Sequence, residues 1–216
     1  MQRIDWAILC LAALLVGVAV FWFTEVEPGS VSNKMESYTR TAWGGVVDED
    51  KNCRDTRQEV LIRDSRVPVL WRDERKCEGA WGAWVDVYSG ESVNDPHAMD
   101  IDHVVSLKEI HEAGGWRWET ARRVRAANWM FNLLAVSAKE NRAKGARGLH
   151  EWLPPRQEFH CRYVEVRATV RFVLRLPPSS VPEADVARRV LDSCAPVLPV
   201  SAKATETNTP PAFVGP

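Results

Sequence analysis

The sequence lacks three features: a large net charge of either sign, a Cys-x-x-Cys pair and an internal repeat. Its 28 Lys and Arg residues are balanced by 29 Asp and Glu residues, so the formal charge of -1 does not by itself indicate an anionic partner. Without a Cys-x-x-Cys pair a structural zinc site is disfavoured, although zinc stays an alternative for the scattered cysteines. The missing repeat and the length of 216 residues favour one domain with a single core.

The balanced total conceals a local excess of positive charge. The stretch from Trp116 to Arg175 contains 11 Arg and 2 Lys but only 5 Glu and no Asp. Such a stretch could face a polyanion, or it could be a solvated helix surface, and charge alone does not separate the two. Several of the ten tryptophans lie among these arginines, where core packing is the first interpretation and stacking on nucleic-acid bases the second.

An unbroken apolar run extends from Ala7 to Phe23 near the N-terminus. A run of this kind is typical of a membrane anchor or a signal segment, here residues 1–24. Bulky residues rather than small ones end the run, which favours an uncleaved anchor over a cleaved signal peptide. Both alternatives predict an extracytoplasmic protein, either single-pass membrane-anchored or secreted.

Cysteine usage agrees with export to an oxidising compartment. Cys10 lies in the apolar run, which leaves an even number of cysteines, Cys53, Cys77, Cys161 and Cys194, in the rest of the chain. Four cysteines allow three pairings. We expect Cys53 to pair with Cys77 and Cys161 with Cys194, because each pair closes a loop of modest length.

The chain divides into three parts after the apolar run. Residues 25–51 are polar and aperiodic and are expected to form a linker, 52–194 the folded domain, and 195–216 a disordered tail rich in Pro and Thr. Short strands are expected at 60–62, 67–71 and 81–88, and a helix at 181–193. Ser180 and Glu183 have the spacing of a capping box at the start of that helix.

The segment Met99–Val105 carries the chemistry that stands out most. Its alternation of apolar and acidic residues predicts a strand on which Asp100 and Asp102 share one face, with His103 at the end. An Asp supplies a hard oxygen ligand to a divalent cation, and a neutral His beside it can take a proton from water. Taken alone, the Asp-His pair is also compatible with a purely structural histidine.

The sequence downstream strengthens the catalytic interpretation. Residues 131–137 predict a second strand, and a helix that contains Asn141 and Lys144 follows from Ala138. In a strand–strand–helix unit, Asn141 could reach across to Asp102, so that both hold one metal ion. A buried Asn132 is expected to hydrogen-bond the imidazole of His103 and fix its tautomer. The alternatives are a turn residue for Asn132 and an exposed helix position for Asn141.

Four segments carry a resemblance to a known family. They are Asp-Ile-Asp-His-Val-Val at 100–105, Asn-Leu-Leu-Ala-Val at 132–136, Asn-Arg-x-Lys-Gly at 141–145 and Trp-Leu-Pro-Pro at 152–155. In order and spacing the chain resembles the HNH endonucleases, specifically an exported type related to the C-terminal domain of the GmrSD restriction endonuclease. The resemblance implies an α+β fold with a ββα-metal core of the HNH or His-Me finger kind, surrounded by helices and short strands and stabilised by disulfides.

The resemblance also assigns roles to individual residues. It implies that Asp102 and Asn141 bind the metal, that His103 is the general base, and that Asn132 is the middle residue of an H-N-N variant. Arg142 and Lys144 follow the ligand Asn141 and are expected to contact phosphate or to be helix surface. The chain departs from the family pattern in two places. Trp129 follows Asn128 where an Asp is usual, and Ser106 replaces a Pro.

Together these patterns predict a metal-dependent endonuclease that hydrolyses phosphodiester bonds in DNA, with RNA as the other candidate substrate. A metal shell made only of oxygen atoms suits Mg²⁺ best, with Mn²⁺ as a second choice and Zn²⁺ less suitable. The expected partners are nucleic acid and, if residues 1–24 are retained, a membrane. The alternatives are a non-catalytic extracellular module that binds nucleic acid, and a disulfide-stabilised domain with no nucleic-acid role.

Overall fold

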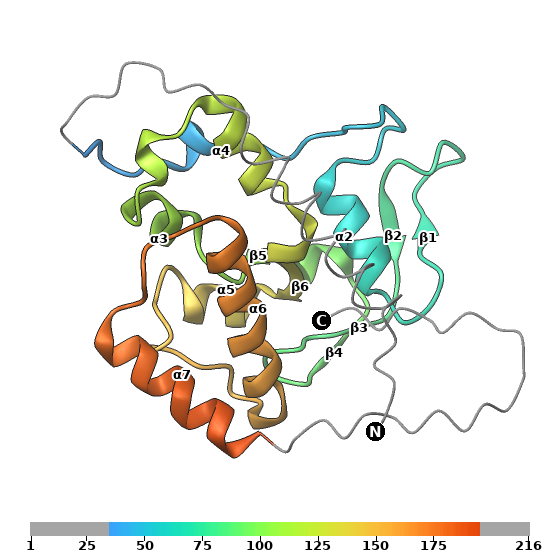
Figure 1. Cartoon of the computed structure of the whole chain (residues 1–216). Coiled ribbons are helices and arrows are strands. Elements are labelled where there is room, and N and C mark those ends of the chain that lie inside the picture. Colours follow the sequence, from blue (N-terminus) through green and yellow to red (C-terminus); the bar gives the residue numbers. More distant parts are fainter. Residues whose placement is uncertain (1–34, 195–216) are drawn as a thin grey trace, which may run out of the picture.

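The computed structural model describes residues 35–194, which form a mixed α+β domain (Figure 1). The predicted anchor or signal segment and the predicted C-terminal tail lie outside these residues. No helix within 35–194 is both long enough and apolar enough to cross a membrane. The helices are α2 (Thr56–Asp64), α3 (Leu107–Glu112), α4 (Thr120–Ala127), α5 (Ala138–Lys144), α6 (His160–Val173) and α7 (Val181–Ser193). The strands are β1 (Leu70–Trp71), β2 (Gly79–Trp81), β3 (Trp84–Val85), β4 (Ser92–Val93), β5 (Met99–His103) and β6 (Leu133–Ser137).

The strands form three separate antiparallel pairs, of which β5 and β6 are the central one (Figure 1). In this pair Met99 lies opposite Ser137 and His103 lies opposite Leu133. Helix α5 begins directly after β6, where the hydroxyl of Ser137 accepts a hydrogen bond from the backbone N–H of Glu140 at 3.2 Å. The predicted order of strand, strand and helix is therefore confirmed.

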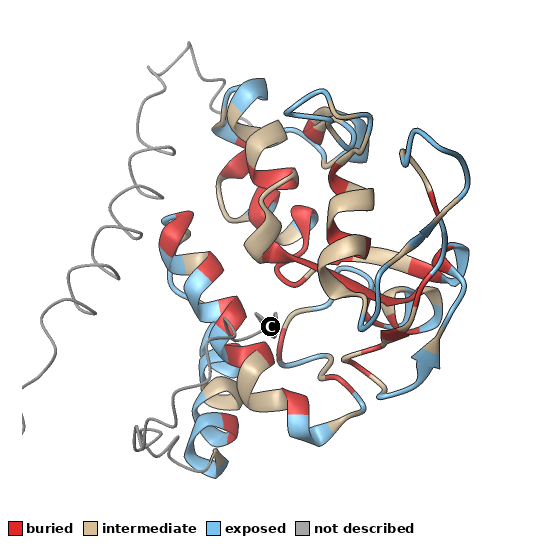
Figure 2. Ribbon diagram, turned by 90° about the vertical axis from the view of Figure 1, so that its right-hand side faces the viewer, coloured by how far each residue is buried: buried red, intermediate tan, exposed pale blue. Residues whose placement is uncertain are grey.

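The β5–β6 pair lies between two hydrophobic clusters because its side chains alternate between two faces. Leu133 and Ala135 pack with Met99 and with residues of α2 on one side. Leu134 and Val136 pack on the other side in the larger cluster, which α3, α4, α6 and α7 complete. Buried residues gather on the inward sides of these helices, whereas their outer sides are exposed (Figure 2). Both faces of β6 are buried, which explains its continuous apolar sequence.

The expected strand at 60–62 is wrong, because these residues belong to α2. The carboxylate of Asp55 accepts a hydrogen bond from the backbone N–H of Gln58 at 3.0 Å and so caps the helix. Val60 and Leu61 are buried against the smaller cluster from this helix. The cap and the tertiary burial outweigh the β-propensity of the three apolar residues. The other two expected strands are present only as short pieces at 70–71, 79–81 and 84–85.

The expected linker at 25–51 is wrong for its C-terminal part, since the domain begins before residue 52. Trp43, in the 3-10 helix η1 (Arg40–Trp43), is completely buried in the larger cluster. Asn128 fastens the residues that follow, because its side chain donates to the carbonyl of Gly45 at 3.0 Å and accepts from the N–H of Val47 at 3.2 Å. The polar composition of this segment predicted a linker, but Trp43 and Asn128 attach the segment to the folded domain.

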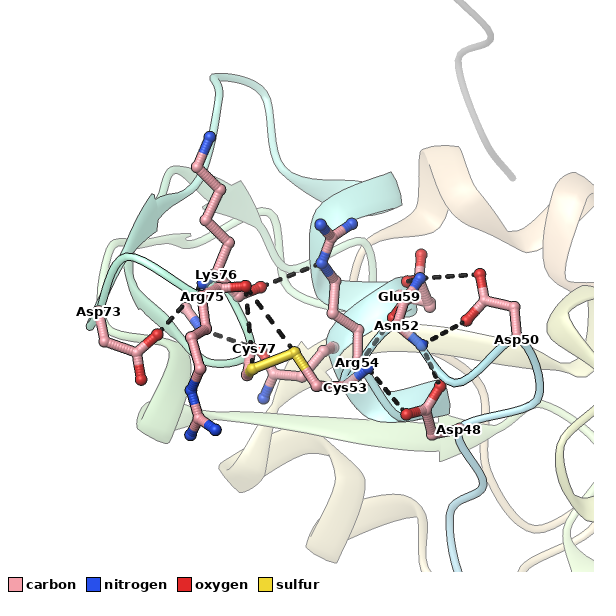
Figure 3. The surroundings of a disulfide bond; sticks show 12 residues. Asp48, Asp50, Asn52, Cys53, Arg54, Glu59, Asp73, Arg75, Lys76 and Cys77 are labelled. Atoms are coloured by element: carbon pink, nitrogen blue, oxygen red, sulfur yellow. Dashed lines mark hydrogen bonds between the residues drawn. A yellow bond between two sulfur atoms is a disulfide. The ribbon is translucent and has the colours of Figure 1, made fainter.

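Both predicted disulfides are confirmed. Cys53 is bonded to Cys77, which fastens the loop between β1 and β2 to the chain just before α2 (Figure 3). The loop that leads to Cys53 is ordered by Asp48, which accepts backbone hydrogen bonds from Asn52 at 3.1 Å and from Cys53 at 2.8 Å (Figure 3). The second disulfide, between Cys161 and Cys194, joins the start of α6 to the end of α7.

Helix α7 has the bounds that the sequence predicts, but its expected capping box is wrong. The side chain of Ser180 makes no cap hydrogen bond. Glu183 is turned away from the helix start and forms an ion pair with Arg167 of α6 instead. Ser106, found where the HNH endonucleases that the sequence resembles usually have Pro, does act as a cap: its hydroxyl accepts from the N–H of Glu109 at 3.1 Å at the start of α3.

Candidate active site

His103 is the last residue of β5, and its imidazole is held by a backbone carbonyl. The side chain is half-buried, and its Nε2 donates a hydrogen bond to the carbonyl of Ala127 at 2.8 Å. A carbonyl can only accept, so Nε2 carries the proton and Nδ1 carries the lone pair. Nδ1 takes part in no hydrogen bond with residues 35–194. The end of α4 therefore fixes the tautomer that a proton acceptor at Nδ1 requires.

Burial lowers the pKa of His103 to about 4. The hydrogen bond to Ala127 and the charge of Asp102 oppose this shift, while the positive charges of Arg40 and Lys144 reinforce it. The imidazole is consequently neutral at pH 7 and can accept a proton. The same low pKa makes it a weaker base than an ordinary histidine.

Asp102 lies on the opposite face of β5 from His103 and is almost fully buried. Its Oδ2 accepts a hydrogen bond from the hydroxyl of Tyr88 at 2.6 Å, and its Oδ1 accepts one from Nζ of Lys144 at 2.8 Å. Burial, together with the charge of Asp102 and the neighbouring Tyr163, raises the pKa of Tyr88 well above its ordinary value. Tyr88 therefore remains protonated and keeps donating to the carboxylate.

Lys144 has no exposed surface, and its ammonium also donates to the carbonyl of His103 at 2.8 Å. The expected phosphate contact by Lys144 does not agree with this position, because the charge is enclosed by Asp102 and by the backbone of β5. The physical reason is helical spacing: Lys144 lies three residues after Asn141 and therefore on the same face of α5, the face that contacts β5. Arg142 of the same helix is exposed, and its expected phosphate contact stays a prediction.

Asn141 is brought to β5 as expected, but it meets Asp100 rather than Asp102. Its Nδ2 donates to Oδ2 of Asp100 at 3.0 Å. Both side chains are partly exposed, whereas Asp102 is buried. The two acids share one face of the strand, as predicted, but they have different partners, because residues 100 and 102 lie at different depths below the surface.

The expected magnesium pair does not fit this arrangement. Both oxygens of Asp102 already accept hydrogen bonds, and the ammonium of Lys144 lies where a cation shared with Asn141 would have to neutralise that carboxylate. Across residues 35–194, no three His, Cys, Asp or Glu side chains gather closely enough to hold a metal ion. We therefore derive no chemical step through a metal held by Asp102.

Asn132 is completely buried, but the expected hydrogen bond to the imidazole of His103 is wrong. Its Oδ1 accepts from the N–H of Val105 at 2.9 Å, and its Nδ2 donates to the carbonyl of Val105 at 3.0 Å. Its own carbonyl accepts from the N–H of Val104 at 2.9 Å. Asn132 thus fixes the two residues that follow His103, and Ala127 takes over the role of orienting the ring.

A network of ion pairs contacts Val104, the residue that follows His103. Arg167 of α6 donates to the carbonyl of Val104 at 3.0 Å and forms ion pairs with Glu109 of α3 and Glu183 of α7. Burial alone would lower the pKa of Arg167, but the two carboxylates and Tyr163 raise it above its ordinary value. This permanently charged group connects three helices to the end of β5.

Sequence reasoning missed three contributors to the site. Tyr88, which bonds Asp102, lies in a predicted strand without any motif of its own. Arg40, which lowers the pKa of His103, lies in the predicted linker. The third, the carbonyl of Ala127, leaves no trace in a sequence because every residue has one. An aromatic pair is also present, in which Trp129, found where the HNH endonucleases that the sequence resembles usually have Asp, is stacked on Phe131 with ring centroids 5.5 Å apart.

The comparisons with known proteins identify a family but not an activity. No family model matches the chain. A protein of Arthroderma benhamiae described as an uncharacterized secreted protein is 32% identical over 162 residues, which cover 74% of this chain and 76% of the relative. The chain belongs to the same family as that secreted protein. No solved structure matches it.

Proposed function

We propose that this protein is a nuclease that hydrolyses phosphodiester bonds with His103 as the general base. The observation that carries the proposal is a neutral, half-buried imidazole at the end of β5, with its tautomer fixed by Ala127 and its Nδ1 in no hydrogen bond with residues 35–194. The order of strand, strand and helix around it, with Asn141 and Arg142 on the helix, supports the resemblance to HNH endonucleases.

In the proposed reaction, Nδ1 of His103 removes a proton from a water molecule as the water oxygen bonds to phosphorus. The bond between phosphorus and the leaving oxygen then breaks, and that oxygen takes a proton from solvent. Negative charge develops on the phosphate during this exchange and requires nearby positive charge. We assign this contact with the phosphate to the exposed Arg142 of α5.

We retain Mg²⁺ dependence as part of the proposal because the resemblance to HNH endonucleases implies it. The side chains left for a cation are the partly exposed pair Asp100 and Asn141, since Asp102 is bonded to Lys144 and Tyr88. The assay below therefore includes arms with and without a divalent ion. Nicking without a divalent ion would remove Mg²⁺ from the proposal but would leave the role of His103 unchanged.

We also propose that the protein acts outside the cytoplasm. Two disulfides join segments of the described domain, and such bonds persist in oxidising compartments. The relative from Arthroderma benhamiae is described as secreted. Whether residues 1–24 act as a membrane anchor or as a cleaved signal remains a prediction from the sequence.

The test is a nicking assay on supercoiled plasmid DNA. The full chain, produced under oxidising conditions, is incubated with Mg²⁺, with Mn²⁺ or with EDTA. With Mg²⁺ we expect nicking by the wild type and by His97→Ala, which changes an exposed histidine, and none by His103→Ala. With EDTA we expect no nicking by any of the three proteins. Nicking by His103→Ala at the wild-type rate would refute the assigned base.

A non-catalytic module that binds nucleic acid is the second candidate. The low pKa of His103 and the presence of Trp129 instead of the family's usual Asp favour it. A folded wild-type protein that binds DNA but leaves plasmid intact under every metal condition would select this candidate over the nuclease.

A further inference from the structure

The arginines of α4 form a charged surface next to His103. Helix α4 has Arg122, Arg123 and Arg125 within eight residues, and its last residue, Ala127, holds the imidazole of His103. Along a helix axis, Arg122 and Ala127 are about 7.5 Å apart, because each residue advances the helix by about 1.5 Å. Charges on this helix therefore lie close to the proposed site of hydrolysis.

Three arginines in this region lack the acidic partners that other arginines of the domain have. Arg123 is paired with Glu36, and Arg171 is paired with Glu109. Within residues 35–194, no carboxylate comes within 4.0 Å of Arg122, Arg125 or Arg175. Arg175 follows the end of α6 and is exposed, and the other two are half-buried.

Arg125 and Arg175 lie near Arg122, because Arg125 is three residues further along the same helix and the guanidinium of Arg122 donates to the carbonyl of Leu174, the residue before Arg175, at 3.5 Å. Burial lowers the pKa of Arg122, and the charges of Arg125 and Arg175 lower it further. The Nε atoms of Arg122 and Arg125 are buried and find no hydrogen-bond partner in the described part of the chain. Gathering like charges in partly desolvated positions costs free energy that an anionic partner would recover.

Helix stability does not explain this placement. Arg122 lies in the first turn of α4, where the helix dipole favours acidic residues, and that turn contains none. The guanidinium of Arg122 is instead stacked over the ring of Trp118, with its carbon 4.0 Å from the ring centroid. This contact holds the charge at the surface in a defined position.

We propose that Arg122, Arg125 and Arg175 bind the phosphate backbone of a nucleic acid and so guide a strand to His103. We call these three residues the arginine face. This inference rests on the proposed nuclease function and adds the surface by which the substrate is held. Guanidinium groups suit phosphate because their planar N–H groups donate two parallel hydrogen bonds, and a chain of phosphates can engage all three arginines together.

The test measures binding separately from cleavage. The His103→Ala protein, which leaves DNA intact under the proposal, is titrated into a fluorescein-labelled duplex of two helical turns over a range of salt concentrations. Fluorescence anisotropy gives Kd, and the slope of log Kd against log salt counts phosphate contacts. The triple variant Arg122→Gln, Arg125→Gln, Arg175→Gln is compared in the same background.

Loss of three phosphate contacts should reduce the magnitude of the slope by about 2.7. Between about 50 and about 200 mM salt, the unsubstituted arginine face should therefore lose about 40-fold more affinity than the triple variant. The control is Arg66→Gln, Arg188→Gln, Arg189→Gln, which removes the same charge from exposed positions outside α4 and α6. Equal slopes for the triple variant and this control would overturn the proposal.

A second variant separates a loss of phosphate contacts from misfolding of the triple variant. Arg125→Gln with Arg175→Gln leaves the stacking of Arg122 on Trp118 intact, and it should reduce the slope by about 1.8. Vesicles containing anionic lipid form a further arm. If the arginine face binds these vesicles and not DNA, a membrane is the partner and the proposal is wrong.

The two proposals fail in different ways. If the protein nicks plasmid DNA but the arginine face contributes nothing to binding, the proposed binding surface is wrong and the proposed nuclease function stands. If DNA binding depends on the arginine face but the plasmid stays intact under every condition, the proposed nuclease function is wrong and the proposed binding surface stands.

Discussion

Replacing Lys144 by Met should reveal how strongly the fold depends on the buried ion pair beneath His103. Lys144 donates to Oδ1 of Asp102 and to the carbonyl of His103, both at 2.8 Å, and has no exposed surface. Lys144→Met keeps most of the side-chain volume but removes the charge. The carboxylate of Asp102, which is 5% exposed, would then keep only the hydroxyl of Tyr88 as a partner.

The expected loss follows from the asymmetry of buried ion pairs. Removing one partner leaves an uncompensated buried charge and destabilises a protein by about 3–5 kcal/mol, whereas replacing both partners is far less costly. We therefore expect Lys144→Met to lower the free energy of unfolding by about 3–5 kcal/mol. The double variant Asp102→Asn, Lys144→Met should be more stable than Lys144→Met alone, because the amide that replaces the carboxylate of Asp102 carries no charge.

Urea unfolding, followed by tryptophan fluorescence with the disulfides intact, measures this free energy. Lys139→Met is the matched control, since Lys139 of the same helix is 71% exposed and its ion pairs should contribute less than about 1 kcal/mol. The reasoning fails if Lys144→Met is as stable as this control. It also fails if the double variant loses as much stability as the sum of its two single substitutions.

Two further predictions test the site and the domain boundary. Because the pKa of His103 is about 4 in the fold and about 6.5 in an unfolded chain, the unfolded state binds more protons between those values, so stability should fall as the pH drops from 6.5 to 4. The free energy of unfolding in urea should decline by at most about 3 kcal/mol over this range, and His103→Gln should reduce that decline; an unchanged decline in the variant would contradict the assigned pKa. Trp43→Ala should cost about 3–5 kcal/mol in the same assay, because Trp43 fills the larger cluster, whereas a tryptophan in a linker would cost almost nothing.

The parts of the fold that the sequence predicted are those set by local pattern. Alternation along β5 placed Asp100 and Asp102 on one face, and the structure has them there. The start of α5 after Ser137 and the bounds of α7 were also predictable, because helical periodicity is a property of neighbouring residues, although the expected capping box of α7 is absent. Loop length favoured one of the three possible disulfide pairings, and the structure has that pairing.

The parts that the sequence did not predict are partnerships between distant residues. Lys144 matched a family motif that suggested phosphate, yet its partner Asp102 is 42 residues away in the chain, and no local pattern connects the two. Trp43 illustrates the same limit at the domain boundary, since polar neighbours made its segment resemble a linker. The periodicity of a strand fixes which face a side chain takes, but the depth of that side chain depends on the elements packed above it.

The agreement between separate contacts around His103 is what favours a catalytic over a structural histidine. Ala127 fixes the ring from one side, Lys144 holds the carbonyl of the same residue, and Asn132 clamps the two residues that follow. A histidine whose only task was to fill space would not need its carbonyl and the two following residues secured while its Nδ1 makes no hydrogen bond with the described residues 35–194. A general base does need this, because proton transfer requires the lone pair to be held in one direction before the substrate arrives.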